Sequence, residues 1–225
     1  CDLHDFASQL EMVLKHYNND IARSKTPARY AHINWMARGE PLCNPTLTQT
    51  GTDLLMSLAQ PCVERGLIPK FNISTIMPVT YRSQLSDSFP IITPTIYYSM
   101  YSVNPDFRAR WLPAAMPVAQ ALDNLAGYQA TSKKIIKFHG AFIRGENDDP
   151  ERDVQPMMEM IRAFGIQGEF NIVRYNPFDA SQGEESDQLG LIQELISQWM
   201  PCKLIPRVGQ DCKASCGQFI TGDES

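Results

Sequence analysis

The chain has 225 residues, of which 43% are hydrophobic and 20% charged, so it is long enough to bury a sizeable core. Its formal net charge of −5 argues against a protein that coats nucleic acid through an overall positive field, but leaves room for a local basic patch that docks RNA. No apolar run approaches the ~18 residues of a membrane span, and the acidic, amphipathic N-terminus is unlike a signal peptide, so we expect a cytoplasmic protein without membrane contacts.

Short apolar runs rich in β-branched and aromatic residues alternate with longer amphipathic segments along the chain. In chain order, the pattern predicts a helix at 3–17, a strand at 31–36, a helix at 46–65, strands at 71–75 and 93–100, a helix at 116–128, a strand at 135–143, a helix at 150–164, a strand at 170–175, a helix at 185–200 and a strand at 202–207. Prolines mark two of the helix ends: Pro150 lies in the first turn of the helix predicted at 150–164, and Pro201 follows the helix predicted at 185–200.

This alternation predicts an α/β fold with parallel strands and crossover helices. An open doubly wound sheet and a (β/α) barrel both fit it. No GxGxxG segment follows a strand, which favours a barrel or partial barrel over a dinucleotide-binding sheet. The chain contains no internal repeat or linker, so we expect a single domain over residues 1–225.

A set of mostly polar residues lies at or just after the ends of the predicted strands, where active sites of parallel (β/α) folds lie. They are Gly39, Glu40, Ser74, Ser99, Met100, Tyr101 and Asn176. Such groups suit a polar small molecule such as an amino acid or a nucleoside. Taken singly, each has an ordinary alternative: a serine can cap a helix, Asn176 can form a turn with Pro177, and Glu40 can be a solvated loop acid.

Histidines and cysteines give no hydrolytic or zinc pattern. The four histidines, His4, His16, His32 and His139, fall in a predicted helix or in strands, with no HExxH or Ser–His–Asp arrangement. No CxxC pair occurs among the six cysteines, so we expect free thiols and no metal site. Cys216 has Lys213 three residues before it, and a nearby cation favours a thiolate. The alternative is an incidental cysteine near the end of the chain.

Several segments together resemble the RlmN/Cfr family of radical S-adenosylmethionine (SAM) RNA methyltransferases. MARGEPLCNP resembles that family's GMGEPLLN, FNIVRYNPF resembles INLIPWNPF, and GQDCKASCGQFITG resembles the terminal GDDIDAACGQLAG. Between them, FNISTIMP matches STxGxxP, YYSMYSVNPDFRARWLP matches ISLHAPNDxxRxxxxP, and FIRGENDD matches the VND segment. The order and spacing agree over nearly the whole chain, and the NPF and CGQ matches are the most specific.

The resemblance implies a partial (β/α) barrel of the radical SAM type that acts on RNA as a monomer. It implies that Gly39, Glu40, Ser74, Ser99, Met100, Tyr101 and Asn176 contact SAM, and that Cys216 is the methyl-carrying cysteine. In such enzymes one SAM methylates the cysteine, and a radical derived from a second SAM activates that methyl group for addition to an adenine carbon of 23S rRNA or tRNA. This route suits the substrate, because an adenine ring carbon is a poor nucleophile and the cofactor supplies the difficult chemistry.

The sequence departs from the family pattern in several places. The CxxxCxxC motif that binds the [4Fe-4S] cluster is absent from the chain, as are the first barrel strand and the N-terminal RNA-binding domain. Met77 replaces the glycine of STxG, SLH reads Ser99-Met100-Tyr101, and Cys212 is an additional cysteine. A missing N-terminal segment or a partner chain would then supply the cluster. The alternatives are a radical-SAM-derived protein that only binds SAM or RNA, and an unrelated (β/α) barrel enzyme that binds no SAM.

Overall fold

The computed structural model describes residues 1–23, 26–36, 39–177 and 182–207. Within these residues, six strands form one sheet in the order β1-β2-β3-β4-β5-β6, and every neighbouring pair is parallel. The strands are β1 (Tyr30–Trp35), β2 (Ile68–Thr75), β3 (Thr95–Ser99), β4 (Ile136–Gly140), β5 (Gly168–Ile172) and β6 (Cys202–Leu204). A doubly wound sheet reverses its strand order part-way, so this consecutive order gives the partial-barrel arrangement and confirms the predicted parallel α/β fold.

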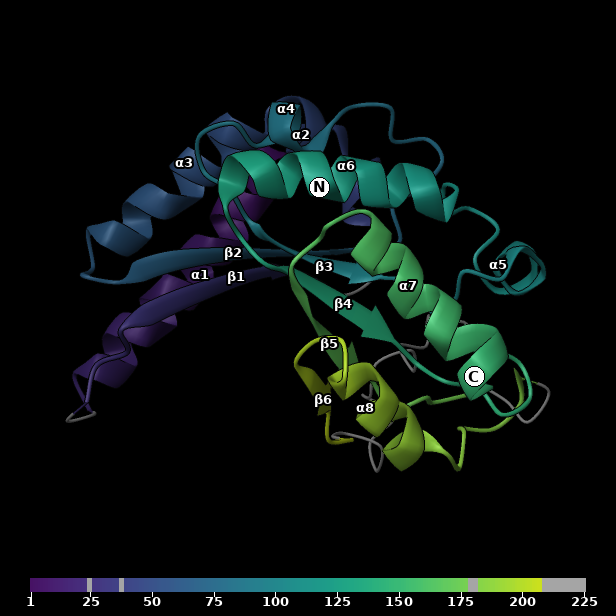
Figure 1. Ribbon diagram of the computed structural model, residues 1–225. Coiled ribbons are helices and arrows are strands. Elements are labelled where there is room, and N and C mark those ends of the chain that lie inside the picture. The colour runs from purple at the N-terminus through teal and green to yellow at the C-terminus, as the bar shows by residue number, and fades with distance from the viewer. Residues whose placement is uncertain (24–25, 37–38, 178–181, 208–225) are drawn as a thin grey trace, which may run out of the picture.

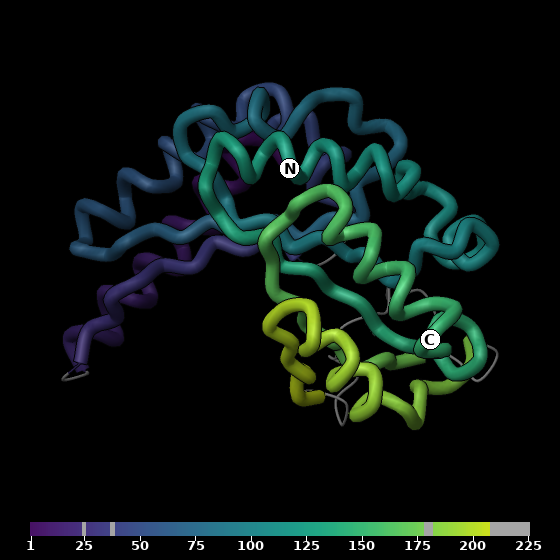
Figure 2. The backbone as a smooth tube through the Cα atoms, in the orientation of Figure 1, coloured from purple at the N-terminus to yellow at the C-terminus, as the bar shows by residue number. Residues whose placement is uncertain are grey.

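The helices cover one face of this curved sheet (Figure 1). They are α1 (Leu3–Ile21), α2 (Pro45–Gln49), α3 (Gly51–Val63), α4 (Leu85–Ser88), α5 (Pro105–Trp111), α6 (Val118–Ser132), α7 (Gln155–Ala163) and α8 (Leu189–Ser197), with a 3-10 turn, η1 (Pro41–Cys43), and a π turn, η2 (Pro150–Val154). The backbone trace makes an arch from the purple end at α1 and β1 to the yellow end at β6 (Figure 2). None of the helices in the described ranges is long and apolar enough to cross a membrane.

The alternation of side chains along each strand separates an apolar outer face from a polar inner face. Outward-pointing Ile73, Tyr98, Phe138 and Phe170 are fully buried in the core formed with the helices. Their strand neighbours on the other face are polar in all the central strands; they include Asn72, Ser74, Tyr97, Ser99, Lys137, His139, Glu169 and Asn171. The inner face of the sheet is therefore chemically suited to a polar ligand.

The helix predicted over 46–65 is two helices in the structure, α2 and α3, which meet at Thr50 and Gly51. Thr50 has φ −123° and ψ 27°, which lie outside helical values. A Cβ atom on Gly51 would be 2.8 Å from the Ser88 carbonyl oxygen and 2.9 Å from the Phe89 ring. The close approach of the α4 segment therefore requires a glycine at this break, a tertiary contact that the local sequence pattern does not reveal.

Candidate functional site

The residues singled out from the sequence lie at the carboxyl-terminal ends of their strands. Gly39 and Glu40 follow β1, and Ser74 is the penultimate residue of β2. Ser99 is the last residue of β3, and Asn176 follows β5. In the sheet register, Ser74 is opposite Tyr97 and Ser99 is opposite His139. All five therefore belong to one rim of the sheet, because adjacent parallel strands end at the same edge.

Glu40 joins the loop after β1 to the loop after β2. Its Oε1 atom accepts hydrogen bonds from Thr75 Oγ1 at 2.6 Å and from the Leu42 amide at 3.1 Å, and its Oε2 atom accepts one from the Ile76 amide at 3.0 Å. Thr75 Oγ1 in turn accepts a hydrogen bond from the Met77 amide at 2.8 Å. A carboxylate has about four acceptor positions, so three are used within the chain and one is left for a ligand.

Thr75, beside Ser74 at the end of β2, was expected at this rim but not among the residues that contact SAM. Thr75 is buried on the outer face of β2, and it is the only donor side chain that reaches Glu40 among the described residues. A polar residue at a buried, outward-facing position one residue before a loop is the signal that would have pointed to it.

Three residues at this rim have left-handed backbone conformations. Gly39 has φ +96°, Met77 has φ +54° and Tyr101 has φ +53°. Glycine adopts such values freely, but a residue with a side chain does so at a cost of roughly 1 to 3 kcal/mol, and such strained residues gather at functional sites. Met77 occupies the position of the glycine in the STxG segment of the RlmN/Cfr pattern. The positive φ at this position explains why that pattern has a glycine.

Ser99 and Met100, at the carboxyl-terminal end of β3, face opposite sides of the sheet. Ser99 lies on the inner face, but the side chain of Met100 has 0% exposure and packs in the helix-side core. The Met100 amide donates to the His139 carbonyl oxygen at 2.8 Å. A ligand on the inner face can therefore contact Met100 only through its backbone, because alternation along the chain turns its side chain away.

Arg108, which the sequence reasoning did not single out, fixes the loop that contains Tyr101. Its buried guanidinium donates to the carbonyl oxygens of Met100 at 3.1 Å, Ser102 at 3.2 Å and Met116 at 3.0 Å. It has no carboxylate partner among the described side chains, and these three carbonyl groups hold it. Its signal in the sequence is the arginine of the ISLHAPNDxxRxxxxP pattern, which falls on Arg108; the Asn104 cap and Pro105 begin the short helix α5 that carries it.

Asn147 links the same loop to the one after β4. Its Nδ2 atom donates to the carbonyl oxygens of Tyr101 at 3.0 Å and Ala141 at 2.9 Å, and its Oδ1 atom accepts from the Ile143 amide at 2.7 Å. The side chain is fully buried. A buried amide with all three bonds made fixes the position of both loops.

The segment that carries Asn176 is held by an ion-pair network. Glu185 pairs with Arg174 and with Arg207 Nη2, the latter at 3.1 Å, and accepts a hydrogen bond from the Tyr175 amide at 2.8 Å. Burial raises the pKa of Glu185, but the bonds from Arg174 and the Tyr175 amide outweigh burial, so the pKa is lowered overall. Asn176 Nδ2 donates to the Arg174 carbonyl oxygen at 3.2 Å. The network was not expected from the sequence, since its members come from three separate segments.

His139 lies on the inner face of β4 between Ser99 and Asn171 in the register. Burial lowers its pKa to about 4, and the neighbouring charge of Lys137 adds to the effect. Its ring makes an edge contact with Tyr97, with 5.0 Å between the centroids. His139 is therefore neutral at pH 7 and can offer one donor and one acceptor nitrogen.

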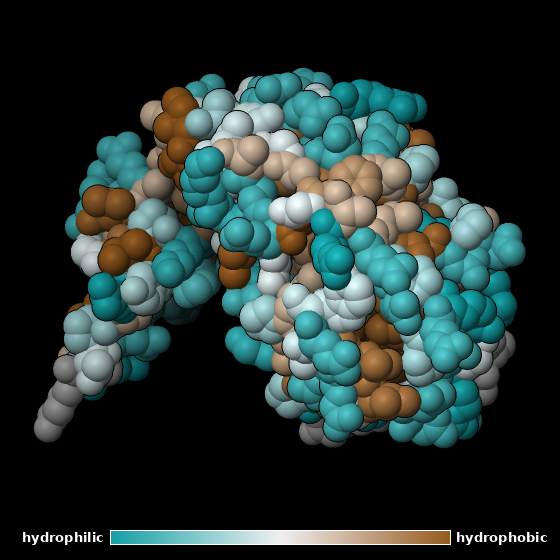
Figure 3. All heavy atoms as spheres, viewed as in Figure 1, coloured by the Kyte–Doolittle hydropathy of each residue, from teal (hydrophilic) through white to brown (hydrophobic). Residues whose placement is uncertain are grey.

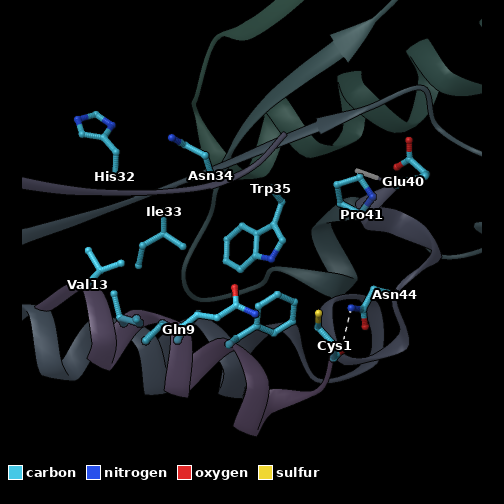
Figure 4. A pocket seen from close by; sticks show the side chains of 14 residues that line it. Cys1, Gln9, Val13, His32, Ile33, Asn34, Trp35, Glu40, Pro41 and Asn44 are labelled. Atoms are coloured by element: carbon cyan, nitrogen blue, oxygen red, sulfur yellow. Dashed lines mark hydrogen bonds between the residues drawn. The ribbon is translucent and has the colours of Figure 1, made fainter. Parts of the chain in front are cut away.

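A cavity of about 660 Å³ opens between α1 and the edge strand β1. In Figure 4, Ile33 and Trp35 point down toward α1, whereas His32 and Asn34 point away from it on the other side of the strand. Glu40 lies at one end of this cavity. The cavity thus occupies mainly the helix side of β1, and the polar inner face that carries Ser74 and Ser99 is a separate surface.

The described residues contain no group of three or more His, Cys, Asp or Glu side chains arranged to hold a metal. Cys1 and Cys43 are exposed, Cys62 is buried, and burial raises the pKa of Cys202 to about 11. These thiols do not fit the ligand set of an iron–sulfur cluster. Cys212 and Cys216 lie outside the described residues.

Curated proteins of similar sequence are RNA methyltransferases. The chain is 26% identical over 206 residues to the probable dual-specificity RNA methyltransferase RlmN of Corynebacterium efficiens, covering 88% of this chain and 54% of that protein. It is 24% identical over 206 residues to the RlmN enzyme of Wolinella succinogenes, covering 86% and 53%. The chain thus spans about half the length of the curated relatives it matches. No family model matches it.

Solved structures of similar fold include a radical SAM methyltransferase and a protein bound to SAM. A radical SAM methyltransferase from Sphaerobacter thermophilus superposes with a TM-score of 0.74 at 17% identity, covering 97% of this chain and 61% of that one. Streptococcus suis SuiB bound to SAM superposes with a TM-score of 0.62 at 10% identity, covering 92% and 44%. In sequence the chain is thus similar to RlmN RNA methyltransferases, and in fold it is similar to a solved radical SAM methyltransferase.

Proposed function

We propose that this chain is the SAM-binding part of a radical SAM methyltransferase that methylates an adenine carbon of RNA, either 23S rRNA or tRNA. The observation that carries the proposal is the meeting of Glu40, Ser74, Ser99 and the Asn176 segment at one rim of the sheet, within a fold and sequence like those of such enzymes. The protein acts as a cytoplasmic monomer and as one domain over residues 1–225.

SAM fits the polar groups of this rim. The remaining acceptor position of the Glu40 carboxylate suits the methionine ammonium group in a charge-assisted hydrogen bond. Ser74 and Ser99 offer hydroxyl groups on the inner face, and Asn176 offers an amide to the ribose or the carboxylate. When bound, SAM supplies the methyl group and the radical chemistry, and these residues orient it.

Cys216 is the proposed methyl carrier. Its thiol would take the methyl group of SAM to form a thioether, with S-adenosylhomocysteine as the leaving group and loss of the thiol proton. A [4Fe-4S] cluster is also required for the radical chemistry, but the described thiols do not fit one. We therefore propose that an N-terminal segment or a partner chain provides the cluster ligands.

The test is anaerobic reconstitution of the full reading frame that contains this chain, with iron and sulfide analysis, followed by mass spectrometry of RNA incubated with SAM. We expect a methyl group on an adenine carbon with the wild-type protein and none with Cys216→Ala. RNA methylation by Cys216→Ala would contradict the role of Cys216.

The second candidate is a radical-SAM-derived protein that binds SAM or RNA without catalysis. The lack of a cluster ligand set in the described residues favours it for this chain on its own. A calorimetric titration with SAM, with and without iron, separates the two: catalysis requires iron-dependent SAM turnover, whereas simple binding is the same in both conditions. An unrelated barrel enzyme would not bind SAM in either.

A further inference from the structure

A cluster of cations and one aromatic ring lies at the end of the sheet opposite the candidate site. We call the residues Arg29, Tyr30, Lys70 and Lys134 the basic patch; they lie at the amino-terminal ends of β1 and β2 and just before β4. Lys70 Nζ is 4.3 Å from the centroid of the Tyr30 ring, and Arg29 Cζ is 5.2 Å from it. Tyr30 is 37% exposed, and Arg29 and Lys70 are also exposed, so the patch is open to a ligand.

Lys134 brings a further positive charge close to Lys70. Asn72 pairs with Thr95 in the register, so Lys70, two residues earlier, is level with Thr93. The Nζ atom of Lys134 donates to the Thr93 carbonyl oxygen. Burial lowers the pKa of Lys134, and the charge of Lys70 lowers it further, in keeping with two ammonium groups that lie near each other.

No carboxylate neutralises the basic patch among the described residues. Cations elsewhere in these ranges, such as Arg110, Arg144 and Arg174, pair with glutamates, but Arg29, Lys70 and Lys134 form no ion pair. The chain as a whole carries an excess of acidic residues, with a net charge of −5. Like charges gathered without a counter-charge repel one another, and an anionic ligand would relieve that repulsion.

The patch shares the inner face of the sheet with the candidate site. Lys70 and Ser74 are four residues apart on the same face of β2, which is about 13 Å at a strand rise of about 3.3 Å per residue. Figure 3 shows an arched molecule with a hollow open below the sheet between its two ends. A chain lying along this hollow can reach the patch and the rim together.

We propose that the basic patch binds a single-stranded nucleotide of the RNA substrate next to the one whose base reaches the rim. Lys70, Arg29 and Lys134 contact phosphate oxygens, and the base stacks on the Tyr30 ring in place of a cation that moves from the ring to a phosphate. Cations beside an aromatic ring are the arrangement that binds single-stranded nucleic acid without a demand for sequence. This inference rests on the proposed function, because it places RNA on the inner face.

The test is fluorescence anisotropy of a labelled single-stranded RNA bound to the chain, at several salt concentrations. We compare Lys70→Glu with Arg162→Glu, a matched charge reversal on an exposed arginine of α7, on the helix-covered face. Lys70→Glu should weaken binding at least tenfold and Arg162→Glu less than twofold.

Lys70→Gln should reduce the slope of log K against log salt by about 0.7, the value for one phosphate contact to a single strand. Tyr30→Ala should weaken binding of single-stranded RNA at least fivefold and binding of a duplex little.

Circular dichroism of each variant checks that it is folded. Equal effects of Lys70→Glu and Arg162→Glu, or no effect of either, would overturn the proposal. Loss of binding to anionic lipid vesicles, but not to RNA, in Lys70→Glu would overturn it in favour of a membrane surface. A SAM titration of the same proteins separates failure of this inference from failure of the proposed function. If SAM binds and Lys70→Glu leaves RNA binding intact, the basic patch does not bind RNA and the proposed function stands. If SAM does not bind but RNA binding depends on Lys70, the proposed function is wrong and RNA binding by the basic patch stands.

Discussion

Replacing Thr75 with valine tests whether the Glu40–Thr75 bond holds the candidate site together. Valine has nearly the same shape but removes the hydroxyl that donates to Glu40 Oε1 at 2.6 Å and accepts from the Met77 amide at 2.8 Å. A hydrogen bond to a charged group contributes about 1.5 to 3 kcal/mol, and a buried amide left without an acceptor costs about 1 to 3 kcal/mol. Because such losses are not fully additive, we expect Thr75→Val to lower the free energy of unfolding by about 2 to 4 kcal/mol.

Thr75→Ser is the matched control, because it keeps the hydroxyl and removes only a buried methyl group, at a cost of about 1 kcal/mol. Urea unfolding of both variants and of the wild type gives the comparison, provided that the dependence on urea concentration is the same in all three. A Thr75→Val protein no less stable than Thr75→Ser would refute the reasoning, since the methyl and not the hydroxyl would then be the important group.

Three further outcomes follow from the same contacts. Arg108→Met should cost about 2 to 4 kcal/mol of stability in urea unfolding, because it leaves buried carbonyl groups unpaired, whereas Arg110→Met should cost about 1 kcal/mol or less, because the Arg110 side chain is exposed. The folded-state pKa of His139, about 4, is below its ordinary value of 6.5, so its contribution to stability is present above pH 6.5 and is lost as the pH falls toward 4, up to about 3 kcal/mol. His139→Gln should therefore show a shallower loss of stability over that range than the wild type, and an identical pH profile would contradict the assignment. At pH 8, iodoacetamide should alkylate exposed Cys43 before Cys202, whose pKa is raised by burial, as peptide mass spectrometry would show; equal rates would count against the burial of Cys202.

Every predicted strand is present in the structure, because short apolar runs between polar turns are a strong local pattern. Their ends were less accurate. The strand predicted over 135–143 ends at Gly140 in the structure, because the apolar residues Phe142 and Ile143 are buried in the loop that Asn147 holds and not in the sheet. Apolar character alone cannot separate a strand from a loop that packs into the core.

The helix predicted over 150–164 begins with a π turn, η2, and Pro156, which has no amide hydrogen to donate, lies in the first turn of α7 that follows it. The Val154 amide instead donates five residues back, to the Asp149 carbonyl oxygen, at 3.1 Å. The proline was visible in the sequence, but the way in which the chain accommodates it depends on the Asp149 cap. The short helix α5 was missed, because seven residues give too few apolar positions for a helical period.

The sequence located the rim but not the contacts that hold it. Residues at or just after strand ends can be recognised from their positions, so Glu40, Ser74 and Ser99 could be expected at this rim. Thr75 and Arg108 act through bonds to residues distant along the chain or to backbone carbonyls, and no local pattern reports such partners. The outward direction of the Met100 side chain follows from alternation along the strand, and would have been predicted had that alternation been applied to the segment.

The most direct test of the central claim is to follow an isotopically labelled methyl group from SAM to Cys216. The reconstituted full reading frame is incubated with SAM that carries the label, and the proteolytic peptide containing Cys216 is analysed by mass spectrometry. We predict that the label appears on Cys216 before it appears in RNA. Labelled RNA without any label passing through Cys216, or a label on another cysteine in its place, would contradict the account.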